Sequence, residues 1–216
     1  HIAIDKRIPI AAGLGGGSAD AAAVLRGLNR LTGRGLTADD LRGLAAGLGA
    51  DVPFFVAPCP ALGTGIGQNL QALACTVEGV VVIVSPGFPL TAAWAYAHLA
   101  SHGGPGAPGL DSLIAALACG SLDTVAECTF NALEVAVLDT FPLVDMLRES
   151  LVANGCLTAH VSGSGPTLYG LCRPADSAAI VTALQGQYGS AVEVFASPIV
   201  TGTAGPLGPG ESARGA

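Results

Sequence analysis

The chain has 216 residues, of which 50% are apolar and 12% are charged, and its formal net charge is −7 at pH 7. This length and apolar content suffice for one sizeable hydrophobic core or two small ones. The 9 lysines and arginines are scattered, so the sequence offers no basic surface for nucleic acid. The apolar runs are too short to cross a bilayer and no signal peptide opens the chain, so we expect a cytoplasmic protein that makes no membrane contact.

The two ends of the sequence differ in character. Ile2, Ile4 and Ile8 alternate with other residues at the start, which predicts a strand, and we expect a further segment to precede His1. Residues 201–216 consist mainly of glycine, proline, serine and alanine without periodicity. Such a composition buries too little surface to order itself, so these residues are predicted to be a flexible tail.

Between the ends, helical and strand patterns alternate in chain order. Apolar residues at helical spacing predict two helices, over residues 24–31 and 41–48, and Thr37 with Asp40 forms a capping signal before the second. The later elements are a buried strand that ends in a turn within GVVVIVSPG, residues 79–87, and helices over 91–100, 110–117 and 130–152 with a break at Phe141 and Pro142. Strands on either side of the turn at 162–166, a helix over 174–188 and a strand over 191–196 follow. Since helices and strands do not alternate regularly, the α+β class is favoured over a doubly wound sheet.

The cysteines give no sign of a metal or disulfide framework. The chain has 6 of them, far apart and without a C-x-x-C pair. We expect them to be buried thiols.

The stretch IPIAAGLGGGSADAAAVLRGLNRL, residues 8–31, holds four glycines within positions 13–17 and leads directly into a predicted helix. Backbone N–H groups at a helix N-terminus lack intrahelical partners and favour an anion, so a phosphate chain is the natural occupant. A tight turn with close packing is the competing interpretation. The common P-loop pattern G-x-x-x-x-G-K-[ST] is absent, as is G-x-G-x-x-G, because position 18 is serine.

This stretch resembles the second motif of the GHMP kinases, a family that includes galactokinase, homoserine kinase, mevalonate kinase and phosphomevalonate kinase. The variant G-L-G-G-G-S-x-D-A-A, together with LGADVPFF at 48–55, ALGTGIGQNL, VVVIVSPGFPLT, NALE and VSGSGPTLYG, is similar to the branch that phosphorylates a cytidine-diphosphate-linked methylerythritol. The resemblance extends from about residue 4 to residue 196.

The resemblance implies a two-lobed α+β fold. Residues 1–76 would be the remainder of an ATP-binding lobe of the ribosomal protein S5 domain 2-like type that lacks its first strands. Residues 77–200 would form a ferredoxin-like C-terminal lobe. Because the family's P-x-K-x-N-L strand and its lysine are absent, we expect this chain alone to be weakly active or inactive.

The resemblance also assigns the ATP site. Ser18 would lie near the phosphates and Mg²⁺, and the turn formed by Gly163, Ser164 and Gly165 would close on the same phosphate region. The residues of the phosphate loop would be Pro9, Ile10, Ala11, Ala12, Gly13, Leu14, Gly15, Gly16, Gly17, Ser18 and Ala19.

Asp51 is the candidate catalytic acid/base. Phosphoryl transfer to an alcohol requires a carboxylate that orients the hydroxyl or accepts its proton, and Asp51 stands beside an apolar VPFF segment. Asp with a proline in the first helical turn is equally typical of a helix start, so from the residues alone Asp51 could merely cap a helix that contains Pro53. The resemblance favours the catalytic role.

The substrate side of the site is less well defined. Thr91 and Tyr96 are candidate substrate residues, and the stretch PGFPLTAAWAY leaves open whether Trp94 or Tyr96 stacks on the cytosine. Lys6, the one lysine of the chain, is placed by the resemblance near the adenosine, and Gln68 replaces a usual glutamate.

The expected function is therefore ATP-dependent phosphorylation of the 2-hydroxyl of the cytidine-diphosphate-linked methylerythritol in non-mevalonate isoprenoid biosynthesis. A non-catalytic nucleotide-binding remnant and another GHMP kinase, such as homoserine kinase, are the alternatives. The expected partners are the small-molecule substrate, ATP and Mg²⁺, and a homodimer is left open.

Overall fold

The computed structural model describes residues 1–102 and 109–202 of the chain. These residues form two compact units. The first unit contains residues 1–5, 15–75 and, among the described residues, 200–202; the second contains Lys6–Leu14 and Thr76–Ile199. Of the predicted tail, residues 203–216 lie outside the described residues, whereas Gly202 pairs with Cys75 in an isolated bridge of the first unit.

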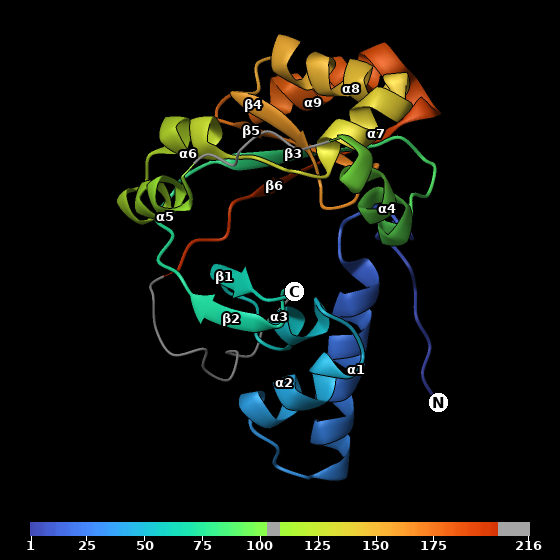
Figure 1. Ribbon diagram of the computed structural model, residues 1–216, viewed down its shortest axis with the longest axis vertical. Coiled ribbons are helices and arrows are strands. Elements are labelled where there is room, and N and C mark those ends of the chain that lie inside the picture. Colours follow the sequence, from blue (N-terminus) through green and yellow to red (C-terminus); the bar gives the residue numbers. More distant parts are fainter. Residues whose placement is uncertain (103–108, 203–216) are drawn as a thin grey trace. The chain divides into compact units, whose positions relative to one another are not determined.

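The first unit is a helical cluster with a small hairpin (Figure 1). Its core contains Ala22, Leu41, Ala45, Val52 and Val56. Strands β1 and β2 are antiparallel and pair from Ala61 with Ala72 to Thr64 with Asn69. The elements of this unit are α1 (Gly16–Thr32), α2 (Ala38–Ala46), α3 (Val52–Val56), β1 (Ala61–Thr64) and β2 (Asn69–Ala72).

Local signals explain where the helices of the first unit begin and end. Helix α1 ends at Gly33, whose φ of 62° is the left-handed conformation that glycine adopts easily. Helix α2 begins with a complete capping box, in which the Thr37 hydroxyl accepts from the Asp40 N–H and the Asp40 carboxylate accepts from the Thr37 N–H. The predicted capping signal at Thr37 is therefore confirmed.

The second unit is an antiparallel sheet with helices packed on one face (Figure 1). The strand order is β4-β5-β3-β6. The helical connections run from β3 to β4 and from β5 to β6, which is the β-α-β-β-α-β order of a ferredoxin-like unit. The elements of this unit are β3 (Val80–Ser85), α4 (Ala92–His102), α5 (Leu110–Cys119), α6 (Leu122–Cys128), α7 (Glu134–Thr140), α8 (Pro142–Ala153), β4 (Thr158–Val161), β5 (Leu168–Cys172), α9 (Ser177–Tyr188), the 3-10 turn η1 (Gly189–Ala191) and β6 (Glu193–Pro198).

The core of the second unit lies between the sheet and helices α7, α8 and α9. Val82 and Val84 of the central strand β3 are fully buried, and they pack with Leu147 of α8 and with Ile180 and Leu184 of α9. The break predicted at Phe141 is confirmed: Phe141 has an extended φ of −120°, and Pro142 occupies the first turn of α8.

The strand predicted at the start of the chain is wrong. Residues 1–8 contain no strand, and Ile2 and Ile4 are more than half exposed. Alternating apolar residues favour a strand only where a neighbouring strand supplies hydrogen bonds, and none of the described strands pairs with this segment.

The cysteine prediction is confirmed for Cys75, Cys156 and Cys172, which are buried, whereas Cys119 is exposed. All of the cysteines are free thiols. Within the described parts of the chain, no helix has both the length and the hydropathy needed to cross a membrane.

Candidate active site

The N-terminus of α1 offers uncapped backbone amides. Gly15 is the N-cap residue, so it provides no side-chain cap, and the first bond of the helix runs from the Ala19 N–H to the Gly15 carbonyl at 2.9 Å. Among the described residues, no acceptor meets the N–H groups of Gly16, Gly17 and Ser18, and the first turn carries no acidic side chain. The positive end of a helix of 17 residues is therefore available to an anion.

Packing explains two of the four glycines of this loop. Gly13 has a φ of +76°, and a Cβ on it would lie 2.1 Å from the carbonyl oxygen of Ser162. Gly15 has a φ of +66°, and its Cβ would lie 2.8 Å from the ring of Phe55. A Cβ on Gly17 would meet no other atom within 4 Å. Close packing, one of the two interpretations of this loop, therefore accounts for Gly13 and Gly15 but not for Gly17.

The predicted phosphate loop spans both units. Residues 9–14 belong to the second unit and residues 15–19 to the first. In the second unit the Ala11 carbonyl accepts from the Leu90 N–H at 2.9 Å, and Ala12 is buried. Pro9 and Ile10 line a cavity of about 560 Å³, together with Lys6 and residues of the 85–89 and 190–193 segments.

The turn at 163–165 contacts the glycine loop directly. Ser162, which precedes the turn, donates a hydrogen bond from its Oγ to the Gly13 carbonyl at 2.9 Å. Gly163 and Gly165 have φ values of 56° and 78°, which favour glycine, and the Gly165 N–H donates to the Ser162 carbonyl. The structure therefore brings these two predicted segments together, through residues 13 and 162–165 of the second unit.

Two side chains of the NALE stretch support this turn. Asn131 donates from Nδ2 to the carbonyls of Val161 and Gly163, each at 2.8 Å. The Glu134 carboxylate accepts from the Val161 N–H at 3.1 Å and contacts His160 Nδ1 at 3.0 Å. The NALE stretch contributes to the family resemblance, but the sequence does not indicate what its side chains do, because their partners lie about thirty positions away in the chain.

Glu134 also affects a partly buried tyrosine. Burial, and secondarily the charge of Glu134, raises the pKa of Tyr169 to about 12. Tyr169 therefore keeps its phenolic proton at neutral pH.

Asp51 stands at the N-cap position of α3, but its side chain makes no capping hydrogen bond. Its carboxylate is exposed. Helix α3 is fixed against α1, because the Phe55 ring lies against Gly15 and the Arg26 side chain donates to the Val56 carbonyl at 3.4 Å. An uncommitted carboxylate therefore begins a helix that packs on the glycine-initiated helix.

The β1–β2 turn lies next to Asp51. A Cβ on Gly67 would be 3.8 Å from Asp51 Oδ1, and the φ of Gly67 is +105°. Gln68 stabilises this turn, because its Oε1 accepts from the Ile66 N–H at 2.8 Å. Gln68 thus has a structural function in the turn.

The candidate substrate residues lie at the start of α4. The Thr91 hydroxyl accepts from the Trp94 N–H at 3.3 Å, so it caps the helix. Trp94 stacks on His98 with ring centroids 4.1 Å apart and also packs on Phe141. Tyr96 is 63% exposed. Of the two aromatic residues, Tyr96 is the one with a free ring.

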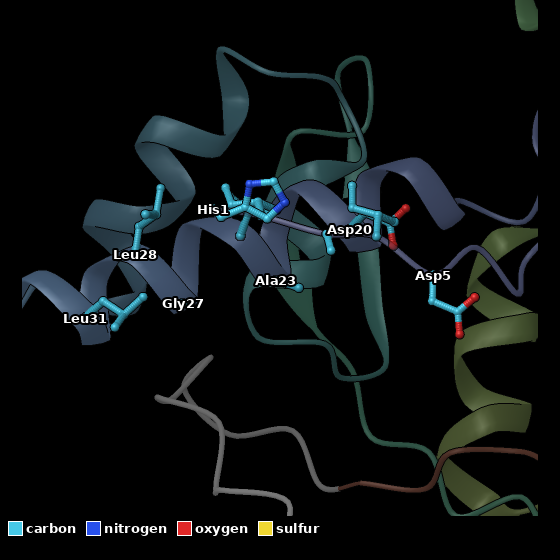
Figure 2. Close-up of a pocket in the computed structure, with 11 residues that line it drawn as sticks. His1, Asp5, Asp20, Ala23, Gly27, Leu28 and Leu31 are labelled. Atoms are coloured by element: carbon cyan, nitrogen blue, oxygen red, sulfur yellow. The ribbon is translucent and has the colours of Figure 1, made fainter.

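A second cavity, of about 470 Å³, belongs to the first unit. Figure 2 shows that His1 and Asp5 of the N-terminal segment lie beside α1, whose Asp20, Ala23, Gly27, Leu28 and Leu31 form the opposite wall. It contains none of the predicted site residues. Among the described residues, no group of three or more His, Cys, Asp or Glu could hold a metal ion.

Two family models match the chain, one for the GHMP kinases N terminal domain over residues 1–58 and one for the GHMP kinases C terminal over residues 113–190. A curated relative from Syntrophotalea carbinolica, named 4-diphosphocytidyl-2-C-methyl-D-erythritol kinase, is 41% identical over 177 residues, which cover 82% of this chain and 61% of the relative. A relative of the same name from Gloeobacter violaceus is 41% identical and covers 90% of this chain and 66% of the relative. The chain thus spans about three fifths to two thirds of the length of these relatives.

Solved structures agree with the family models. A crystal structure of 4-(cytidine 5'-diphospho)-2C-methyl-D-erythritol kinase matches with a TM-score of 0.76 and 32% identity, over 92% of this chain and 70% of that one. A homoserine kinase from Cytophaga hutchinsonii matches with a TM-score of 0.69 at 19% identity, over 91% of this chain and 68% of that one, which shows the fold alone. The predicted α+β GHMP kinase fold is confirmed, and the chain belongs to the GHMP kinase family.

Proposed function

We propose that the protein is a small-molecule kinase that transfers a phosphoryl group from ATP to the 2-hydroxyl of 4-diphosphocytidyl-2-C-methyl-D-erythritol, in the non-mevalonate pathway to isoprenoid precursors. The names of relatives at 41% identity and of a solved structure at 32% identity support the substrate. The observation that carries the proposal is the exposed Asp51 carboxylate, which caps nothing and begins a helix packed on the uncapped N-terminus of α1.

The phosphates of ATP would bind the amides at the start of α1. Gly16, Gly17 and Ser18 present N–H groups without protein acceptors, and the absent side chain at Gly17 leaves open space. The remainder of the phosphate loop is residues 9–15 and 19, with the turn at 163–165 against Gly13. ATP supplies the transferable phosphoryl group when it is bound.

The residues present also fit Mg²⁺. A magnesium ion bound with ATP keeps several waters and phosphate oxygens, so it needs few protein ligands. The Ser18 hydroxyl makes no hydrogen bond to another described residue and stands on the first turn of α1. We therefore assign Ser18 as the protein contact of that ion.

Asp51 would act on the acceptor alcohol. Its carboxylate accepts a hydrogen bond from the 2-hydroxyl and orients that oxygen toward the γ-phosphoryl group of ATP. It takes the proton as the new phosphorus–oxygen bond forms and the bond from the γ-phosphorus to the bridging oxygen breaks, with ADP as the leaving group. Since Asp51 makes no capping bond, both carboxylate oxygens are available for this role.

Thr91 and Tyr96 are proposed to contact the cytidine-linked substrate. The exposed ring of Tyr96 can stack on a pyrimidine, whereas Trp94 is already occupied by His98 and Phe141. Thr91 would contribute in addition to its capping bond, through the second lone pair of its hydroxyl. A cytoplasmic location and a homodimer stay predictions.

A direct acceptor comparison tests the proposal. The complete product of the gene is incubated with ATP, Mg²⁺ and either the cytidine-linked methylerythritol or homoserine, and new phosphomonoesters are followed by phosphorus NMR. We expect transfer to the first acceptor alone. Transfer to homoserine alone would replace the substrate assignment, and ATP binding without transfer to either acceptor would indicate a nucleotide-binding remnant.

A further inference from the structure

The side chain of Asn131 holds the backbone on both sides of Ser162. Its Nδ2 donates to the Val161 carbonyl and to the Gly163 carbonyl, each at 2.8 Å. Its Oδ1 accepts from the Leu133 N–H at 3.0 Å, which fixes the orientation of the amide. Asn131 therefore uses both ends of its amide, and the two donated bonds bracket a single residue.

The bracketed residue is the one that reaches the glycine loop. Ser162 donates from Oγ to the Gly13 carbonyl at 2.9 Å, and the missing Cβ of Gly13 lets the Ser162 carbonyl approach. A displacement of the 162–165 turn would therefore break a hydrogen bond to Gly13 and open a backbone contact with it. All of these residues belong to the second unit, so the connection is internal to that unit.

The amide is itself anchored to the core of the second unit. Asn131 lies three residues before α7, and the fully buried Ala136 and Val137 hold that helix in place. Glu134 of the same helix accepts from the Val161 N–H at 3.1 Å, which fixes the end of β4 independently. Residues 131–134 thus support the turn at two points, and Asn131 is the one that contacts both neighbours of Ser162.

We propose that Asn131 is a positioning residue for the phosphate loop: it fixes the 162–165 turn, and through Ser162 it fixes the geometry of Gly13. Asn131 acts through other residues and touches no reacting atom. The consequence for nucleotide affinity rests on the proposed function, whereas the consequence for the glycine loop does not.

Hydrogen exchange measured by NMR tests this connection. The Leu90 N–H donates to the Ala11 carbonyl and so reports whether residues 6–14 are docked, and the Gly165 N–H reports on the turn itself. We expect Asn131→Ala and Asn131→Asp to raise exchange at both amides by roughly tenfold, because two hydrogen bonds no longer oppose local opening. Exchange in the central strand β3 should change much less.

Asn154→Ala is the matched control. Asn154 also donates from Nδ2 to a backbone carbonyl, that of Ser150 at 2.8 Å, at the end of α8 in the same unit. This variant should leave exchange at Leu90 and Gly165 unchanged. If Asn131→Ala behaves like the control, or raises exchange in β3 by the same factor as at Leu90, Asn131 has only a general structural role and the proposal is overturned.

A double-mutant cycle identifies the route. In a Ser162→Ala background, where the bond to the Gly13 carbonyl is already lost, Asn131→Ala should raise Leu90 exchange by a smaller factor than in the original protein. Equal factors in both backgrounds would refute the route through Ser162.

Calorimetry with ATP separates this inference from the proposed function. We expect Asn131→Ala to weaken ATP binding by roughly tenfold, because the loss of the two hydrogen bonds that Asn131 donates changes an equilibrium constant by about that factor. If the original protein binds no ATP, the proposed function fails, and the exchange data still decide whether Asn131 positions the glycine loop. If it binds ATP and Asn131→Ala binds equally well, the consequence for the nucleotide is refuted.

Discussion

Replacing Gly13 by alanine tests the contact that joins the glycine loop to the 162–165 turn. Gly13 has a φ of +76°, and the new Cβ would lie 2.1 Å from the Ser162 carbonyl oxygen and 3.0 Å from the Gly165 nitrogen. A left-handed alanine costs about 1–2 kcal/mol by itself. No real contact is as short as 2.1 Å, so the segment must also move and lose the bond from Ser162 Oγ, worth about 1 kcal/mol more.

Gly87→Ala is the matched control for Gly13→Ala. Gly87 has a φ of +77° in the same unit, but nothing lies within 4 Å of its missing Cβ. It should therefore show the conformational cost alone, about 1–2 kcal/mol, against about 2–3 kcal/mol for Gly13→Ala. The difference between the two variants isolates the contact with the turn.

The free energy of unfolding can be followed in urea by the fluorescence of Trp94, the one tryptophan of the chain, which packs on Phe141 in the second unit. Exchange at the Leu90 N–H detects the other response, in which residues 6–14 detach and the rest of the unit stays folded. We expect Gly13→Ala to exceed Gly87→Ala in at least one of these measurements. Equal effects in both would refute the reasoning that Gly13 is required by its contact with Ser162.

Three further outcomes are expected. Asp51→Asn should lower kcat by about 10² to 10⁴ in the complete gene product with little change in unfolding free energy, and unchanged kcat would remove Asp51 from the mechanism. Thr37→Ala should destabilise α2 by about 1 kcal/mol in urea. The Thr37 hydroxyl and backbone N–H lower the pKa of Asp40, so the variant should raise that pKa in an NMR titration; since the pKa is lowered on folding, this stabilisation is present at neutral pH and is lost as the pH falls through the lowered value. Burial, and secondarily Cys172, raises the pKa of Cys156 to about 12, so iodoacetamide at about pH 8 should label the exposed Cys119 well before Cys156, as mass spectrometry can show.

Local signals predicted most of the helices and the sheet strands. The capping residue Thr37, the glycine after α1 and the proline at the start of α8 act within a few residues of themselves, so the sequence displays them directly. The hairpin β1–β2 was not predicted, because its strands have four residues each and their pattern is too short to recognise. The strand predicted at residues 1–8 failed for the opposite reason: the pattern is present, but no described strand pairs with it.

The same division holds for the candidate site. Its glycines and Asp51 could be selected from the sequence because glycine before a helix and aspartate before proline have specific local meanings. The sequence does not determine whether Asp51 caps α3, because a cap depends on where the side chain points. The structure shows that the Asp51 side chain makes no capping hydrogen bond.

The sequence by itself indicated the family, most of the helices and the sheet strands, and the positions proposed for the phosphate loop and for Asp51, because spacing and local turn chemistry encode them. Only the tertiary structure decided why Gly13 must be glycine and what holds the 162–165 turn. The bond from Ser162 to Gly13 joins residues 149 positions apart, and Asn131 reaches the turn across about thirty. Contacts at such separations form only when the sheet and α7 have packed, so they leave no periodic or local pattern in the sequence.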